Sequence, residues 1–497
     1  MKLRLRRSSL PAVAALLFGA PAPACAENGA ASVSPFMLIP FLLLLLLIAV
    51  MPFLRRIWWE KRYPLVSAGL GCVTILYYLV VLRNPDRMAA TGMDYFSFIV
   101  LIGSLFVAAG GIHLRIRGDS TPLSNTLLLS AGALASSVLG TTGASMILIR
   151  PFIRSNRRRL RGYHIVFFIF LVANIGGALS PIGDPPLFLG YLSGVPFFWV
   201  LENTWPIWAV AVALLALVFY AVDTVNFRRI GPAAERDGRH EEAGTAGTHN
   251  FLFVCVIVLS VFVEHPRLLR EGLMITAAAA SYVTTKKEVH RANEFNFRPM
   301  KEVAILFFGI FATMVPALDW LEMNAAHVGI ASPGQFYWGS GILSGVLDNA
   351  PAYRSFLSAA IGLFVDQNMV AQVQLLVARH GGDAAALGGA TADQARMTFG
   401  VLERYHADLV AAGTVSPELI KVSFLIANQA LYLKAISIGS VFFGAVTYIG
   451  NGPNFMVKSI SEQMGAECPA FSTYILRYSL PVLLPVFALV WFLFFIR

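Results

Sequence analysis

Charged residues are scarce in this sequence, since Asp, Glu, Lys and Arg make up 13% of its 497 residues, about half of their share in a soluble domain. Cysteine is scarce too, and four cysteines are too few for a disulfide-stapled scaffold. Hydrophobic residues reach 57%, which excludes disordered and collagen-like chains. The net charge of +10 comes from Lys and Arg between long apolar runs, as membrane orientation requires, and does not indicate nucleic-acid binding. The composition predicts an all-α polytopic membrane protein.

Residues 1–26 have the pattern of a signal peptide. A basic start is followed by an apolar stretch, Leu10–Ala20, and by the small-residue pattern Ala24-Cys25-Ala26, as at a cleavage site. The alternative is an uncleaved first helix, which the prolines at 11, 21 and 23 disfavour. We therefore expect a protein of the bacterial inner (cytoplasmic) membrane whose mature N-terminus lies outside the cytoplasm.

About ten apolar runs are long enough to span a bilayer. Basic loops near 55–62, 226–249 and 286–291 place their flanks on the cytoplasmic side and agree with an outside N-terminus. Residues 27–93 would hold the N-terminal membrane helices, and 226–301 a linker loop and connecting helices. The runs lie near 36–54, 63–82, 94–114, 164–195, 205–225, 250–264, 270–285, 302–321, 434–461 and 471–496.

Two apolar segments are predicted to be re-entrant hairpins. The first, about 122–151, has arginines on both flanks, so a single span would place one cluster on the wrong side. A hairpin that enters and leaves the membrane on the cytoplasmic side keeps both arginine clusters on that side. The alternative is two short helices with a glycine kink. The second, about 333–364, would open to the outside. A polar stretch, about 366–417, follows it and is predicted to be an external insertion.

An internal repeat relates two glycine-rich interruptions. Residues 177–188 and 444–455 are offset by 267 and share six of twelve residues. Each breaks a span with Gly and Pro, at about 164–195 and about 434–461. The charge rule gives the two spans opposite directions, which predicts an inverted-topology repeat of 94–225 and 302–497. Broken helices at matching positions of inverted halves indicate a transporter site near the bilayer midplane.

These motifs resemble those of the ion transporter superfamily of secondary carriers. The residues concerned are Asn174–Gly177, Ile182–Pro186 and Leu347–Asn349. The nearest patterns are those of NhaD-type sodium/proton antiporters, arsenite permeases and the pink-eyed-dilution P protein, with "putative citrate transport" relatives. The resemblance implies a homodimer of inverted-repeat protomers and an elevator-like motion. This chain departs from the pattern at Asn451, where an Asp is expected, and at Thr141–Gly143, where arsenite permeases usually place Asn-Asp.

Two carboxylates fall at predicted interruptions of the membrane helices, Asp184 at the first helix break and Asp348 at the tip of the second hairpin. Ionisable groups at membrane depth are costly and mark functional sites, so both are assigned to coupled Na⁺ and proton binding, as candidate Na⁺ ligands. The alternatives are structural: Asp184 as an acceptor for helix N–H groups and Asp348 as a hairpin cap. The remaining candidate ion- or substrate-binding residues are Thr141, Thr142, Gly143, Ser145, Asn174, Gly183, Asn349, Gly450, Asn451 and Asn454.

The predicted function is a secondary transporter, a sodium/proton antiporter in the first place. The alternative is a carrier of citrate, another organic anion or an arsenite-like oxyanion, coupled to H⁺ or Na⁺. Enzyme motifs such as His-Glu-x-x-His or a nucleophile elbow are absent. We expect no cofactor; the partners would be the lipid bilayer and a small ion or anion. Asp223 and Asp319 are expected at the membrane interface, and the arginines of 154–161 on the anionic leaflet.

Overall fold

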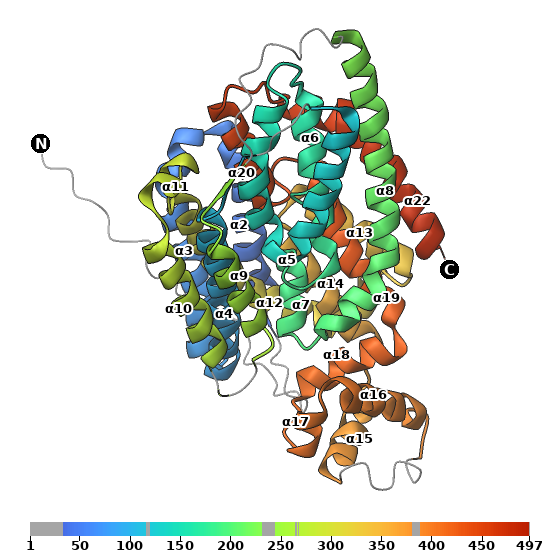
Figure 1. The fold of residues 1–497 in the computed structure, drawn as a ribbon. Coiled ribbons are helices and arrows are strands. Elements are labelled where there is room, and N and C mark those ends of the chain that lie inside the picture. Colours follow the sequence, from blue (N-terminus) through green and yellow to red (C-terminus); the bar gives the residue numbers. More distant parts are fainter. Residues whose placement is uncertain are drawn as a thin grey trace, which may run out of the picture.

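The computed structural model describes residues 33–115, 120–230, 244–263, 266, 268–379 and 388–496. Helices form one broad body, from one end of which a smaller group projects (Figure 1). The predicted signal peptide, 1–26, lies outside the described residues and stays a prediction.

One side of the body gathers the N-terminal helices with helices from the middle of the chain (Figure 1). Their apolar faces meet around the buried side chains of Phe98, Leu105, Met274 and Phe311. We call these helices the first helix group. They are α2 (Ile39–Leu54), α3 (Arg56–Leu76) with the π-helical turn Tyr77–Val81, α4 (Pro85–Gly110), α9 (Asn250–Ser260), α10 (Leu269–Thr284), α11 (Lys287–Ala292) and α12 (Arg298–Asn324).

The remaining membrane helices form a second helix group with its own core, around Phe168, Phe170, Tyr337 and Phe442. They are α5 (Pro122–Ser155), α6 (Gly162–Leu171), α7 (Pro185–Leu192), α8 (Phe197–Ile230), α13 (Pro333–Val346), α14 (Asn349–Phe364), α18 (Pro417–Asn428), α19 (Ala430–Phe443), α20 (Gly452–Gln463), α21 (Phe471–Thr473) with the π-helix Tyr474–Leu483, and α22 (Leu484–Phe494). Two short strands, β1 (His113–Arg115) and β2 (Gly244–Ala246), pair antiparallel.

Membrane-length helices dominate. Among the described residues, eight helical segments are long and apolar enough to cross a membrane, and ten if each of two sharply bent helix pairs is one span. The bends measure 91° between α14 and α15 and 100° between α18 and α19. The chain is therefore an all-α polytopic membrane protein, as its composition predicted.

Helix α5 folds back on itself. Its 34 residues would extend about 51 Å if straight, yet Asn125 and Asn156 at its two ends exchange side-chain hydrogen bonds of 2.7 and 2.9 Å. The reversal occurs at Gly140, whose φ of 74° is open to glycine but disfavoured for other residues. Residues 122–155 thus form a hairpin, begun by a capping box between Thr121 and Ser124.

Helices α13 and α14 form the second hairpin. A capping box of Ser332 and Gln335 starts α13, and the extended residues Leu347 and Asp348 separate the two arms. The arms pack closely, since a Cβ added to Gly339 would lie 2.7 Å from the Phe356 ring.

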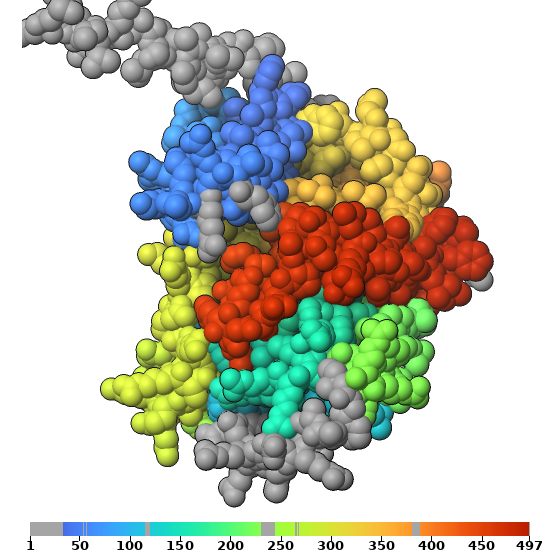
Figure 2. Space-filling model, turned by 90° about the horizontal axis from the view of Figure 1, so that it is seen from above, coloured from blue at the N-terminus to red at the C-terminus, as the bar shows by residue number. Residues whose placement is uncertain are grey.

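The segment after this hairpin projects from the body as α15 (Gln367–Ala378), α16 (Ala392–Tyr405) and α17 (Ala407–Ala411) (Figure 1). We call α15–α17 the insertion. No element was predicted between residues 418 and 433, yet α18 lies here, with its Ile420 and Leu425 side chains buried. With 12 residues, α18 is too short to stand out as a span. Seen from the end opposite the insertion, the C-terminal segment, in red, crosses between the N-terminal helices, in blue, and α8, in green (Figure 2).

Candidate functional site

Asp184 is the centre of a buried polar network. Its side chain is 1% exposed. One carboxylate oxygen accepts hydrogen bonds from the Thr141 hydroxyl and the Asn451 amide, both at 3.0 Å, and the other accepts one from the Asn349 amide at 2.6 Å. The three donors are neutral and come from the first hairpin, the second hairpin and the second broken helix. One carboxylate therefore joins both halves of the repeat.

Four helix starts meet at this carboxylate. Asp184 and Asn451 are the N-cap residues of α7 and α20, Asn349 is the first residue of α14, and Thr141 follows the break at Gly140 in α5. A helix N-terminus carries about +0.5 elementary charge and free N–H groups. The centre therefore favours negative charge, from Asp184 or from a ligand.

Two close backbone approaches explain why the helices break with glycine. A Cβ on Gly183 would lie 2.1 Å from the Gly177 carbonyl oxygen, and one on Gly450 would lie 2.6 Å from the Gly444 oxygen. These two pairs are related by the sequence offset of 267. Both breaks thus have the same geometry, which only glycine permits.

The hydroxyls near the breaks follow the same offset. Ser180 donates to a carbonyl of the first hairpin and accepts the Gly183 N–H at 3.2 Å. Thr447 donates to a carbonyl of the second hairpin at 2.9 Å and accepts the Gly450 N–H at 2.9 Å. Each hydroxyl fixes one loop against one hairpin tip. Sequence reasoning missed this role, although the aligned Ser and Thr were a usable signal.

Asn174 and Asn454 bond each other, with the Asn174 amide donating to the Asn454 oxygen at 2.5 Å. Asn174 also donates to the Ile169 carbonyl at 2.8 Å, and Asn454 donates to two backbone carbonyls. Both side chains therefore satisfy backbone carbonyl groups. The Asn174 oxygen accepts from Asn451 at 3.2 Å, which connects the pair to Asp184.

Asp348 lies beside the network. It is half-buried, and its carboxylate accepts the Ala350 N–H at 3.2 Å, so it caps α14. Its charge still acts on Asp184. The neighbouring Asn349 is fully buried and is held by the Ser344 hydroxyl, which donates to its oxygen at 2.9 Å. Asn349 rather than Asp348 is the residue of this hairpin that bonds Asp184.

Three predicted site residues lie farther along the second arm of α5. Thr142 is half-buried, Gly143 packs against Ala109 of α4, and the buried Ser145 hydroxyl has no hydrogen-bond partner in the described part of the chain. Within these described segments, no hydrogen bond joins any of them to Asp184.

The described residues contain no cluster of typical metal ligands. Residues 33–496, apart from the gaps given above, hold no group of three or more His, Cys, Asp or Glu side chains that could bind a metal. A cation here would need amide, hydroxyl and carbonyl oxygens beside Asp184.

Asp223, expected at the membrane interface near the end of its span, is enclosed by protein side chains near the end of α8. Its carboxylate is fully buried and accepts hydrogen bonds from Arg159 at 2.5 and 2.9 Å, from the Tyr163 hydroxyl at 2.6 Å and from Asn125 at 3.0 Å. Arg159, expected on the lipid surface with its neighbours, is 7% exposed. The pair is buried because α8 passes the open end of the first hairpin, a contact that sequence position does not reveal.

Comparison with known proteins gives one family. The family model described as "Putative citrate transport" matches residues 30–495. A search of curated proteins returns no match. The matched range includes both hairpins, both helix breaks and the insertion.

Proposed function

The chain belongs to the "Putative citrate transport" family and is a secondary transporter, and from this premise we propose that it carries citrate or a related small carboxylate together with H⁺ or Na⁺. The observation that supports this proposal best is the meeting of four helix N-termini at one buried, neutral-donor centre. Helix N-termini can bind an anion even where the site has no basic side chain.

In this proposal Asp184 takes the coupling cation. When Asp184 binds a proton or Na⁺, its negative charge no longer opposes a substrate carboxylate near the same helix starts. The amides of Asn349 and Asn451, which bond Asp184 now, can then turn to the substrate. Cation and anion would thus load together, which couples their movement.

The experiment is uptake of radiolabelled citrate into proteoliposomes under an imposed Na⁺ or pH gradient. We expect uptake by the wild-type protein and loss of its cation dependence in Asp184→Asn. Asp366→Asn is the matched control, since Asp366 is an exposed N-cap outside the site. If the Asp184→Asn variant keeps the cation dependence of citrate uptake, Asp184 does not bind the coupling cation.

A sodium/proton antiporter is the second candidate. It is favoured by the same network, because all donors to Asp184 are neutral and a cation could be its only charge partner. In this case Na⁺ and H⁺ compete for Asp184. Sodium-driven proton efflux without citrate uptake in the same proteoliposomes would select this function.

We propose further that the protein is a homodimer of the bacterial inner membrane, with the insertion outside. Gln367 and Arg157 are exposed. Gln367 begins α15 and Arg157 precedes α6, and these two helices lie at opposite ends of the molecule (Figure 1). In intact cells, an impermeant maleimide should label Gln367→Cys, and Arg157→Cys only after permeabilisation. The reverse pattern would invert the orientation.

A further inference from the structure

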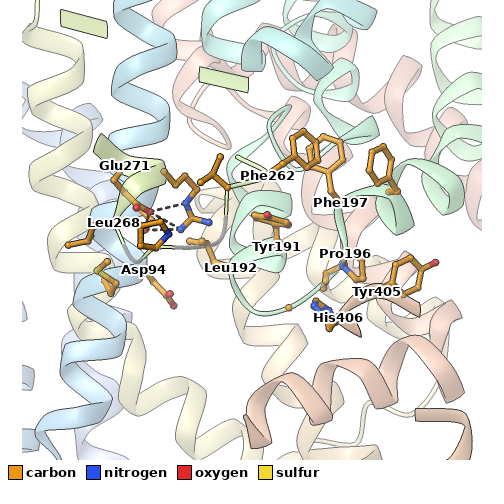
Figure 3. A pocket seen from close by; sticks show the side chains of 18 residues that line it. Asp94, Tyr191, Leu192, Pro196, Phe197, Phe262, Leu268, Glu271, Tyr405 and His406 are labelled. Atoms are coloured by element: carbon orange, nitrogen blue, oxygen red, sulfur yellow. Dashed lines mark hydrogen bonds and ion pairs between the residues drawn. The ribbon is translucent and has the colours of Figure 1, made fainter. Parts of the chain in front are cut away.

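A cavity of about 430 Å³ lies on the side of the body that carries the insertion. Figure 3 shows aromatic side chains on one wall, including Tyr191, Phe197 and Phe262, and charged side chains on the other, including Asp94 and Glu271. Tyr405, at the end of α16, lines it from the insertion. The cavity therefore lies where the two helix groups and the insertion meet.

Behind Asp94 lies an arginine of the second hairpin. Arg354 of α14 pairs with Asp94 of α4 at 3.0 Å and donates another hydrogen bond to the Ser193 hydroxyl. Its side chain is 14% exposed, and its buried Nε has no hydrogen-bond partner among the described residues. A buried guanidinium N–H without an acceptor is costly, so this fork has a free position for another oxygen ligand.

Arg354 is also coupled to the central site through its helix. It lies five residues after Asn349 on α14, a rise of about 7.5 Å along the helix axis. Asn349 donates to Asp184 at 2.6 Å. A ligand that binds Arg354 would therefore contact the same helix that holds Asn349 at the site.

The Arg354–Asp94 pair joins the two helix groups, since α4 belongs to the first and α14 to the second. Alternating access in carriers requires one bundle to move against another, so a bond between them must be able to open. Asp94 is 28% exposed and lines the cavity, whereas Arg354 does not. The charges of Arg87 and Arg270 also act on Asp94, so that its carboxylate keeps cationic neighbours after leaving Arg354.

We propose that this cavity is a docking site for a small di- or tricarboxylate, and that Arg354 accepts a carboxylate of the ligand in exchange for Asp94. The guanidinium fork suits a carboxylate with two parallel hydrogen bonds, and the free Nε supplies the second donor that Asp94 does not use. The choice of ligand rests on the proposed function. The exchange opens the bond between the helix groups only when a carboxylate is present.

The test is binding of radiolabelled citrate to the purified full-length chain, with variants on both sides of the pair. Arg354→Gln should weaken binding about tenfold, because a charged hydrogen bond contributes on this scale, and Arg354→Lys should restore part of it. Asp94→Asn should tighten binding several-fold, because it removes the competing carboxylate. Lys421→Gln, which breaks the 2.5 Å pair with Glu322 outside the cavity, should leave binding unchanged.

The deciding result is that the Arg354 and Asp94 variants change citrate affinity in opposite directions. A merely structural ion pair would change the affinity in the same direction when either partner is removed. Equal shifts, or no shift in Asp94→Asn, would overturn the exchange. Should Arg354→Gln not fold, Arg354→Lys and Asp94→Asn still give the two signs. If binding follows the predicted signs but citrate uptake is absent, the proposed function fails alone; if uptake occurs but the signs agree with each other, only this inference fails. Absence of any citrate binding overturns both.

Discussion

Replacement of Gly183 by alanine should disable the protein, whereas the same change at Gly452 should be tolerated. A Cβ at 183 would lie 2.1 Å from the Gly177 carbonyl oxygen and must move by about 0.9 Å to reach 3.0 Å, below which such contacts are essentially absent. At Gly450 the corresponding distance is 2.6 Å and the shift about 0.4 Å. At Gly452 nothing lies within 4 Å. The obstacle in both tight cases is backbone, which cannot rotate away.

Overpacking of this kind costs about 1–3 kcal/mol. We expect Gly183→Ala at or above the upper end and Gly450→Ala near the lower end. Gly452→Ala, in the first turn of α20, should be neutral or slightly stabilising because alanine restricts the unfolded chain. Displacement of the 183 loop would also stretch the 2.9 Å bond from the Thr141 N–H to the Gly183 carbonyl and misplace Asp184.

The assay is thermal unfolding in detergent, followed by size-exclusion chromatography, with citrate uptake as the functional readout. The three variants should rank Gly183→Ala, Gly450→Ala, Gly452→Ala in order of increasing stability and uptake. A Gly183→Ala protein as stable and active as Gly452→Ala would refute the close backbone approach at the first break.

Three further outcomes are expected. Asp223→Asn leaves the buried Arg159 without its carboxylate and should cost about 3–5 kcal/mol, seen as a large fall in thermal stability; near-wild-type unfolding would contradict the buried pair. Asp348→Ala should lose about 1 kcal/mol of cap stabilisation while Asp348→Asn keeps it, so equal stabilities of the two variants would argue against a capping role. Burial raises the pKa of the Cys468 thiol to about 11, with the charge of Glu462 adding to the effect. Because the thiolate reacts and is the minor form below that pKa, maleimide labelling of Cys468 should be slow at neutral pH and rise tenfold per unit towards pH 9; labelling at neutral pH as fast as that of the exposed control Glu467→Cys would contradict the raised pKa.

Much of the architecture could be predicted because it depends on local patterns. Apolar length gave the spans, and arginines on both flanks of 122–151 gave a hairpin that the structure shows over 122–155. The 267-residue offset gave both breaks. The 12-residue helix α18 was missed because it is too short to span a membrane alone and because its 100° bend into α19 is not visible in the sequence.

The site was predicted as a set of residues but not as a set of contacts. The sequence singled out Asp184 together with Thr141, Asn349 and Asn451. It does not show that the other three side chains donate hydrogen bonds to Asp184. Their meeting depends on how the two halves pack. The same limit applies to Arg354, whose partner lies 260 residues away on α4, so its role required the structure.

The two equivalent positions of the repeat, Asp184 and Asn451, differ in charge, and this difference affects how much charge the protein can carry. Asn451 occupies the position that the repeat equates with Asp184, and an amide cannot change its charge. Together with Asp348, the centre can load at most two monovalent cations on carboxylates. A trivalent anion would then cross with at least one uncompensated negative charge, and each such charge is worth about 2.3 kcal/mol per 100 mV of membrane potential. Transport of a fully ionised tricarboxylate by these groups alone would therefore be electrogenic, and its rate would follow the voltage.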